Sequence, residues 1–229
     1  RLLTDQVSDI LFAPTNVSVN NLINEGIHAK KIELVGDVMY DVALLFSEIA
    51  DRKSNILCHL GLSEKSFVLA TCHRAENTDN PHRLEGILRA LQTIAKEKTV
   101  VFPIHPRTKN KIEQFKLGNL LNKILVISPL SYLDMVMLEK NALAIITDSG
   151  GVQKEAFFYK VPCVTTRDET EWVETLENGW NSLAGAGERS IMEAFNGIYL
   201  RKPNQCKPYG DGQAAERILK QLLINDKIV

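Results

Sequence analysis

The sequence has little of the cysteine that would mark a disulfide-stabilised or zinc-binding protein. Its 229 residues include four cysteines, and no two of them form a C-x-x-C pair. Scattered cysteines argue against a disulfide framework and a zinc site, and they are typical of reduced thiols in the cytosol. We therefore expect a cytoplasmic protein without a bound metal. The cysteines are Cys58, Cys72, Cys163 and Cys206.

Long apolar runs and a strong net charge are also missing. No run approaches the roughly 20 apolar residues that span a bilayer, and the formal net charge is −1. A nearly neutral chain has no general attraction to nucleic acid or to an anionic membrane, so we expect neither as a partner. The chain starts at Arg1, inside a helical pattern, without an initiator methionine or a signal-peptide pattern. We expect it to be part of a longer protein.

The sequence does contain an alternation of short apolar runs and amphipathic stretches. The runs are rich in Val, Ile and Leu without strict alternation, as in strands that are buried on both faces. This alternation predicts an α/β protein with a Rossmann-like parallel sheet and helices on both of its faces. The expected strands are residues 10–13, 31–35, 67–71, 100–104, 124–127, 144–147, 162–165 and 182–184.

The expected elements fall into three sections. Residues 1–52 hold too few elements to close a core alone, whereas residues 53–210 have the size of a complete Rossmann-like domain. A loop at residues 201–212 leads into a closing helix within residues 211–229. The polar residues 51–55 predict a hinge between the first two sections.

The most informative local feature is a glycine-rich turn after the run at residues 144–147. Ser149, Gly150 and Gly151 follow that run and open a helical pattern. Because glycine has no Cβ, backbone N–H groups there can approach anionic oxygens closely, and a helix N-terminus after a parallel strand suits a phosphate. Glu155 lies on the same helical face as Gly151, where its carboxylate can accept both hydroxyls of a ribose. The turn predicts a nucleotide site; the alternative is an ordinary turn capped by Ser149.

Polar residues follow other expected strands at the same edge, where open α/β sheets bind ligands. His73 and Arg74 come after residues 67–71. Together they can bind a diphosphate, because arginine offers a rigid fork of donors and histidine a titratable one. Glu76 can orient Arg74 through an ion pair. For His73 we favour a functional role over that of a capping or surface histidine.

Two further strand ends leave alternatives open. His105 precedes Pro106, which restricts it to an extended conformation. This suits a rigid exit from the strand as well as a ligand contact. Arg167 can reach a phosphate or a carboxylate. Asp168 and Glu169 are better explained as caps of the next helix, because acidic residues are favoured in a first turn.

Five segments, taken in order, resemble the non-hydrolysing UDP-N-acetylglucosamine (UDP-GlcNAc) 2-epimerases. They are residues 35–41, 71–77, 147–156, 167–174 and 208–212. The resemblance runs along nearly the whole chain. It implies the C-terminal half of a GT-B architecture, in which two Rossmann-like domains face each other across a cleft.

The resemblance also implies a reaction and a set of roles. The family is an isomerase that converts UDP-GlcNAc into UDP-ManNAc by eliminating UDP and adding it back, with no nicotinamide or metal cofactor. The phosphate and ribose roles fall on the glycine-rich turn and on the glutamate that follows it. His73 is implied to be a catalytic or diphosphate-contacting residue, His105 to line the same pocket, and the turn from Leu130 to Met135 to lie near the uracil.

Two residues depart from the family pattern. Trp172 stands where many UDP-GlcNAc enzymes carry arginine, and Ala75 replaces a second arginine after the His-Arg pair. A related branch epimerises UDP-2,3-diacetamido-glucuronate, so either sugar is compatible with the sequence. Trp172 is equally compatible with a place in the core, with closing the site, or with a partner domain.

The resemblance also predicts what this chain lacks. The family's acidic catalytic residues belong to the N-terminal domain, most of which is absent here. We therefore expect a chain that binds UDP without epimerising the sugar, and a homodimer for the full-length protein. The alternatives are a glycosyltransferase of the same architecture and a non-catalytic nucleotide-sugar sensor.

Overall fold

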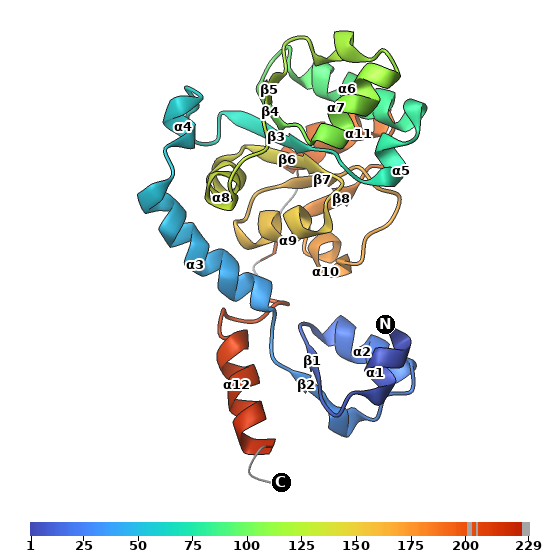
Figure 1. Ribbon diagram of the computed structural model, residues 1–229, viewed down its shortest axis with the longest axis vertical. Helices are drawn as coiled ribbons and strands as arrows, with labels where there is room; N and C mark the ends of the chain where they lie inside the picture. Colours follow the sequence, from blue (N-terminus) through green and yellow to red (C-terminus); the bar gives the residue numbers. More distant parts are fainter. Residues whose placement is uncertain (201–202, 205, 226–229) are drawn as a thin grey trace. The chain divides into compact units, whose positions relative to one another are not determined.

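The computed structural model describes residues 1–200, 203–204 and 206–225 (Figure 1). The chain divides into two compact units, Arg1–Phe46 with Gln205–Val229, and Ser47–Asn204. The boundary between Phe46 and Ser47 lies inside helix α3 (Val38–Lys53). It is several residues before the hinge that we expected at residues 51–55. The loop expected at residues 201–212 lies partly outside the described residues.

The larger unit is built on a parallel sheet of six strands in the order β5-β4-β3-β6-β7-β8. Every strand that the sequence predicts is present, with its ends shifted by at most one residue. The prediction of a Rossmann-like parallel sheet is therefore confirmed. The strands are β3 (Phe67–Thr71), β4 (Thr99–Pro103), β5 (Leu125–Ile127), β6 (Ala144–Thr147), β7 (Cys163–Thr165) and β8 (Asn181–Leu183).

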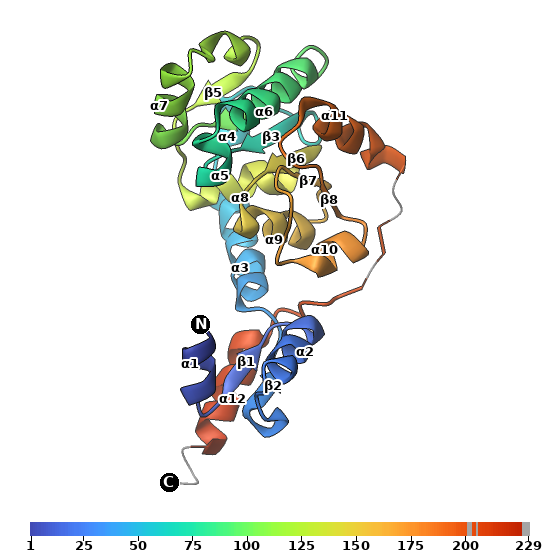
Figure 2. The same cartoon turned by 90° about the vertical axis from the view of Figure 1, so that its right-hand side faces the viewer.

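Helices cover both faces of this sheet, as Figures 1 and 2 show. Side chains alternate along β3, so that Val68 packs with α6, α7 and α11, while Phe67 and Leu69 pack with α4, α8 and α9. Both faces are therefore apolar, which explains the continuous Val, Ile and Leu runs. The helices of this unit are α4 (Ile56–His59), α5 (Ala75–Thr78), α6 (Pro81–Ile94), α7 (Pro106–Gln114), α8 (Tyr132–Asn141), α9 (Gly150–Phe158), α10 (Val173–Glu177) and α11 (Glu188–Asn196), with 3₁₀ turns at Gly118–Leu121 and Gly197–Leu200.

The smaller unit has its own short parallel sheet. Strands β1 (Leu11–Ala13) and β2 (Ile32–Leu34) pair in register, and their core is formed by Ala13, Leu22 and Ile27. The carboxylate of Asp41 accepts hydrogen bonds from the first N–H groups of α12, which stabilises the start of that helix. The helices of this unit are α1 (Leu2–Val7), α2 (Asn16–Asn24), the first part of α3 and α12 (Ala214–Asn225), with a 3₁₀ turn at Ala29–Lys31.

The helices of the described residues are too short or too polar to cross a membrane.

Candidate functional site

The candidate site lies at the topological switch point of the sheet, where the strand order reverses. Strand β4 is added on one side of β3 and β6 on the other, so the loops after β3 and β6 leave the sheet in opposite directions. In open α/β sheets ligands bind in the crevice at such a point, outside the carboxyl ends of the strands. Thr71 ends β3 beside Thr147, which ends β6, and their hydroxyls lie 2.6 Å apart. The residues after these two threonines therefore meet at one edge.

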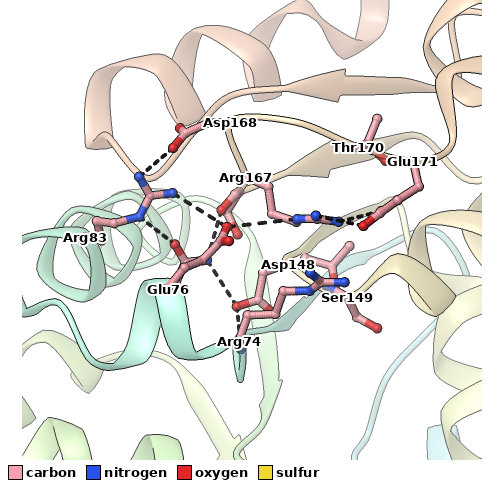
Figure 3. Close-up of polar contacts among 12 residues, drawn as sticks. Arg74, Glu76, Arg83, Asp148, Ser149, Arg167, Asp168, Thr170 and Glu171 are labelled. Carbon is pink, nitrogen blue, oxygen red and sulfur yellow. Dashed lines mark hydrogen bonds and ion pairs between the residues drawn. The ribbon is translucent and has the colours of Figure 1, made fainter. Parts of the chain in front are cut away.

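Asp148 joins the two loops at this edge. It is fully buried, and its carboxylate accepts hydrogen bonds from the N–H groups of His73 and Arg74 at 3.0–3.1 Å. The side-chain amide of Asn77 donates a further one at 3.1 Å. A buried carboxylate held by several N–H donors is strongly stabilised. Asp148 therefore sets where the backbone of His73 and Arg74 lies relative to the glycine-rich turn. Figure 3 shows Arg74 beside Asp148 and Ser149.

Asn77 extends this connection to a third strand. Besides Asp148, its amide nitrogen donates to the carbonyl of Thr166, which follows β7, at 2.9 Å. Its amide oxygen accepts from Arg83 Nε at 2.9 Å. One buried side chain thus ties together the ends of β3, β6 and β7. Our sequence reasoning gave no role to Asp148 or Asn77, although both lie at the strand ends where we searched.

The glycine-rich turn opens α9 as the sequence predicts. Ser149 is the N-cap, and its hydroxyl accepts from the Val152 N–H at 3.5 Å. The capping role that we left as the alternative is therefore present. The amides of Gly150 and Gly151 belong to the first turn, whose N–H groups have no partner inside the helix. They remain suited to an anion, because the positive end of the helix dipole lies there as well.

The space beside Gly150 is crowded by side chains from two other loops. A Cβ added at Gly150 would lie 3.1 Å from Trp172 Nε1, 3.6 Å from Arg74 Nη2 and 3.9 Å from Glu171 Oε2. The absence of a side chain at Gly150 leaves room for this close approach, and a Cβ there would have to displace the Trp172 ring by a few tenths of an ångström. The ammonium group of Lys154 lies 4.2 Å above the ring of Trp172, a cation–π distance. Arg74 and the start of α9 together form a positively polarised edge.

Glu155 lies one turn further along α9 and faces α8. Burial raises the pKa of its carboxyl group, while a hydrogen bond from Tyr132 and the charge of Lys154 oppose that shift. The Tyr132 hydroxyl donates to Glu155 Oε1 at 3.0 Å. Tyr132 is the first residue of α8, and Leu130 and Met135 are half-buried beside it. The segment expected near a uracil is thus adjacent to the residue expected to hold the ribose.

The two candidate histidines have different surroundings. The His73 side chain is 45% exposed, with Nδ1 at 3.9 Å from Asp148 Oδ1, so its ring is available at the edge of the site. His105 is the N-cap of α7, and its Nδ1 accepts from the Arg107 N–H at 3.2 Å. The strand-exit role that we considered for His105 is therefore present, and only its Nε2 is left for a ligand.

Arg167 binds a carboxylate, one of the two kinds of partner that the sequence allowed for it. Its side chain is 4% exposed, and its guanidinium group donates to both carboxylate oxygens of Glu171 at 2.8 and 3.0 Å. This bidentate hydrogen bonding lowers the pKa of Glu171 to about 2. A guanidinium group committed to a carboxylate in this way is poorly placed to bind a ligand phosphate. Its evident role is to hold the loop that carries Trp172.

One ion-pair prediction and one capping prediction are wrong. Glu76 lies 3.9 Å from nitrogens of Arg83 and Arg167, so its recorded ion pairs are with these residues and not with Arg74. Asp168 does not cap α10; it lies 2.8 Å from Arg83 Nη1. The reason is tertiary, because the start of α6 brings Arg83 between the β3 and β7 loops, and sequence spacing does not reveal this (Figure 3).

Comparison with known proteins assigns the family. A family model described as UDP-N-acetylglucosamine 2-epimerase matches residues 1–223. The chain belongs to the UDP-N-acetylglucosamine 2-epimerase family. The resemblance noted in five sequence segments is thereby confirmed.

Relatives within the epimerase family differ in the sugar that their names specify. A UDP-2,3-diacetamido-2,3-dideoxy-D-glucuronate 2-epimerase of Pseudomonas aeruginosa is 48% identical over 228 residues, which are 97% of this chain and 62% of that protein. A UDP-N-acetylglucosamine 2-epimerase homolog of Methanococcus maripaludis is 44% identical over 226 residues, again 97% of this chain and 62% of the relative. The chain thus spans about 62% of the length of these epimerases.

A solved epimerase shares the fold. The crystal structure of the Methanocaldococcus jannaschii UDP-GlcNAc 2-epimerase, in complex with UDP-GlcNAc and UDP, matches with a TM-score of 0.89 at 42% identity. The match covers 98% of this chain and 63% of that one. The GT-B class that the sequence implied is therefore confirmed for this chain, as part of that two-domain architecture.

Proposed function

We propose that this chain forms the UDP-binding part of a UDP-sugar 2-epimerase, with the site in the unit Ser47–Asn204. The observation that carries the proposal is the meeting of Arg74 with the first turn of α9, where Arg74 Nη2 would lie 3.6 Å from a Cβ added at Gly150. A guanidinium group and unpaired helix amides are the donors that a diphosphate prefers. Glu155, one turn later, then receives the ribose, and the loop before α8 receives the uracil.

The reaction requires a firm hold on the leaving group. In the elimination step the bond between the anomeric carbon and UDP breaks, a proton leaves C2 for a basic group, and a C1=C2 double bond forms. The negative charge then lies on UDP, where Arg74 and the amides of Gly150 and Gly151 stabilise it. His73, whose backbone is held by Asp148, adds a titratable donor at the same edge. UDP then forms its bond to C1 again, and C2 takes a proton on the face opposite to the one from which it lost it, so that only C2 is inverted.

Two UDP-sugars are candidates for the substrate. UDP-GlcNAc is favoured by the family model and by the M. jannaschii complex. UDP-2,3-diacetamido-glucuronate is favoured by the 48% identity to the Pseudomonas aeruginosa enzyme. We propose a homodimer for the full-length protein. A glycosyltransferase of the same architecture and a non-catalytic sensor are the competing functions.

Removing the Glu155 carboxylate should weaken UDP binding. Replacement by alanine leaves the ribose hydroxyls without their charged acceptor, so we expect a loss of about 2–3 kcal/mol, or roughly 30- to 150-fold in Kd. Titration calorimetry of UDP against the wild-type chain and Glu155→Ala measures this. The control is Glu113→Ala, because Glu113 is exposed on α7. Equal UDP affinity for wild type and Glu155→Ala would refute the ribose assignment.

The 229-residue chain alone should bind UDP and turn over neither sugar. The family resemblance assigns the acidic catalytic groups to a part that the chain does not include. Product formation from each UDP-sugar is followed by NMR, for the chain and for the full-length protein. We expect epimerisation only with the full-length protein. Epimerisation by the chain alone would contradict the proposed division of roles, and a full-length protein that binds UDP without any turnover would favour the sensor.

A further inference from the structure

Trp172 brings a hydrogen-bond donor without an acceptor to the start of α9. Its indole nitrogen, Nε1, is buried and has no hydrogen-bond partner among the residues that the structure describes. Such a group is rare in folded proteins, because it loses its hydrogen bond to water and gains none in return. The place of Nε1 is also specific, since it would lie 3.1 Å from a Cβ added at Gly150. The proposed reaction has so far given this donor no role.

The space beside Gly150 is the place proposed for the diphosphate. In a helix each Cα–Cβ bond tilts toward the N-terminus, so an atom beside the missing Cβ of Gly150 lies near the end where the first N–H groups point outward. Arg74 Nη2 approaches the same point at 3.6 Å. An indole N–H, a guanidinium group and backbone amides therefore converge there. Phosphate oxygens are the acceptors that bind several such donors at once.

The Trp172 side chain is held in this place by contacts with α9. Its backbone N–H donates to Thr170 Oγ1 at 3.2 Å, and the Thr170 hydroxyl donates to Gln153 Oε1 of α9 at 2.7 Å. The ammonium group of Lys154, also on α9, lies 4.2 Å from the centre of the indole ring, which is a cation–π contact. The loop before α10 is thus attached to α9 at two points. A donor that is fixed in advance binds its acceptor without the entropy cost of ordering a side chain.

Two charged side chains lie close to the same point. Glu171 Oε2 is 3.9 Å from the added Cβ, and the bidentate hydrogen bonds from Arg167 fix this carboxylate and offset its charge. Arg74 differs, because its guanidinium group makes no hydrogen bond to another described residue and only its backbone is held. The Arg74 side chain is therefore able to turn toward a phosphate. This movement opens the space beside the indole nitrogen.

We propose that Trp172 is a ligand-binding residue, whose indole N–H donates a hydrogen bond to a phosphate oxygen of a nucleoside diphosphate at the first turn of α9. The inference rests on the proposed function, because it takes that turn as the diphosphate site. The indole nitrogen is a donor only, so it is complementary to an anion. Of the places that the sequence left open for Trp172, this one is at the site itself.

The same hydrogen bond assists the proposed elimination. As the bond between the sugar and UDP breaks, the diphosphate gains negative charge, and a fixed donor stabilises that charge more than it stabilises the bound substrate. The indole N–H keeps its proton throughout, whereas the His73 ring can lose one. Trp172 therefore adds a donor to the leaving group that does not depend on the pH.

The indole N–H signals in an NMR spectrum test this contact in the wild-type chain. The sequence has two tryptophans, and the N–H of the other one, Trp180, already donates to the Asn204 carbonyl at 3.2 Å. We expect UDP to move the indole proton of Trp172 downfield and to leave the signal of Trp180 in place. The variant Trp180→Phe assigns the two signals. A Trp172 signal that stays in place when UDP is bound overturns the proposal.

Removing the donor should weaken the binding of UDP and not that of uridine. Trp172→Phe keeps an aromatic ring and loses the N–H, so we expect UDP to bind roughly tenfold more weakly, the typical effect of losing a hydrogen bond to a charged group. Uridine has no phosphate, so its Kd should be the same for wild type and variant. Calorimetry measures UDP, and NMR titration measures the weaker uridine. Trp180→Phe is the matched control and should bind UDP like the wild type.

Three results contradict the inference. Trp172→Phe may not leave the affinity for UDP unchanged, weaken UDP and uridine by the same factor, or weaken a UDP-sugar while UDP binds as before. The second result would mean that Trp172 acts on the whole site, and the third that it contacts the sugar. If the variant fails to fold, the NMR signal of the wild-type chain decides.

The outcomes also separate this inference from the function on which it rests. If UDP binds in a manner that depends on Glu155, and the Trp172 signal does not respond, the UDP site stands and the inference falls. If UDP does not bind to the wild-type chain, both are refuted together.

Discussion

Replacing Asp148 with alanine is expected to lower the free energy of unfolding by about 3–5 kcal/mol and to abolish measurable UDP binding. The change leaves the N–H groups of His73 and Arg74 and the amide of Asn77 without their acceptor in a fully buried place. An unsatisfied buried donor costs about 1–3 kcal/mol. The loop after β3 then has no fixed position relative to α9.

Urea unfolding and UDP calorimetry measure the two effects of this change. Asp148→Asn should also lower stability and UDP binding. The asparagine side chain replaces one acceptor oxygen with an NH₂ donor, which would face the N–H groups that donate to Asp148 in the wild type. The matched control is Asp168→Asn at the neighbouring loop, where the carboxylate is 71% exposed and paired with Arg83; an exposed ion pair contributes about 1 kcal/mol or less. Wild-type stability in Asp148→Ala would mean that the two loops are held together by other contacts.

Glu139 is expected to make the chain less stable as the pH rises. A glutamate whose pKa is raised by folding keeps its proton after the unfolded chain has lost it, near pH 4.3. From there up to the raised folded pKa, the folded state binds more protons than the unfolded state. The free energy of unfolding therefore falls with increasing pH, by up to about 1.4 kcal/mol per pH unit for one such group.

The variant Glu139→Gln should remove this part of the pH dependence. Because burial raises the pKa of Glu139 well above its ordinary value, whereas glutamine never has to hold a proton, the variant should match the wild type near pH 4 and become increasingly more stable than the wild type as the pH rises from there. Urea unfolding at four pH values in this range gives both curves. Glu155→Gln should show the same trend, because burial raises the pKa of Glu155 as well. Parallel curves for wild type and Glu139→Gln would show that the pKa of Glu139 is not raised by folding.

The strands and the glycine-rich turn could be predicted because their signals are local. A parallel strand buried on both faces has to be a short apolar run, and every such run in the sequence became a strand. A glycine pair between a strand and a helix needs no distant partner to specify its backbone conformation. As expected, Ser149 is the N-cap of α9, and Gly150 and Gly151 are its first two residues. The strand-end argument also placed His73 and Arg74 at the same edge.

The partners of the charged residues could not be predicted in the same way. Arg167 had the right residue type and position for a phosphate ligand, but its Nη1 and Nη2 both donate to the Glu171 carboxylate. Glu76 was assigned to its sequence neighbour, whereas it lies near Arg83 and Arg167. Which charged residues pair between loops depends on how the following helices pack on the sheet. The spacing of residues in the sequence does not specify this packing.

The sequence by itself determined the α/β class, the edge of the sheet at which polar residues collect, and the family. Each of these follows from the local hydrophobic pattern and from short motifs. The residues that specify a strand, a helix or a glycine-rich turn are close together in the sequence. Only the tertiary structure decided that Asp148 and Asn77 join three strand ends, and that Glu139 lies buried near Glu155. These residues are far apart in the chain, and burial in a low-dielectric interior, which changes what a carboxyl group does, exists only after the elements have packed.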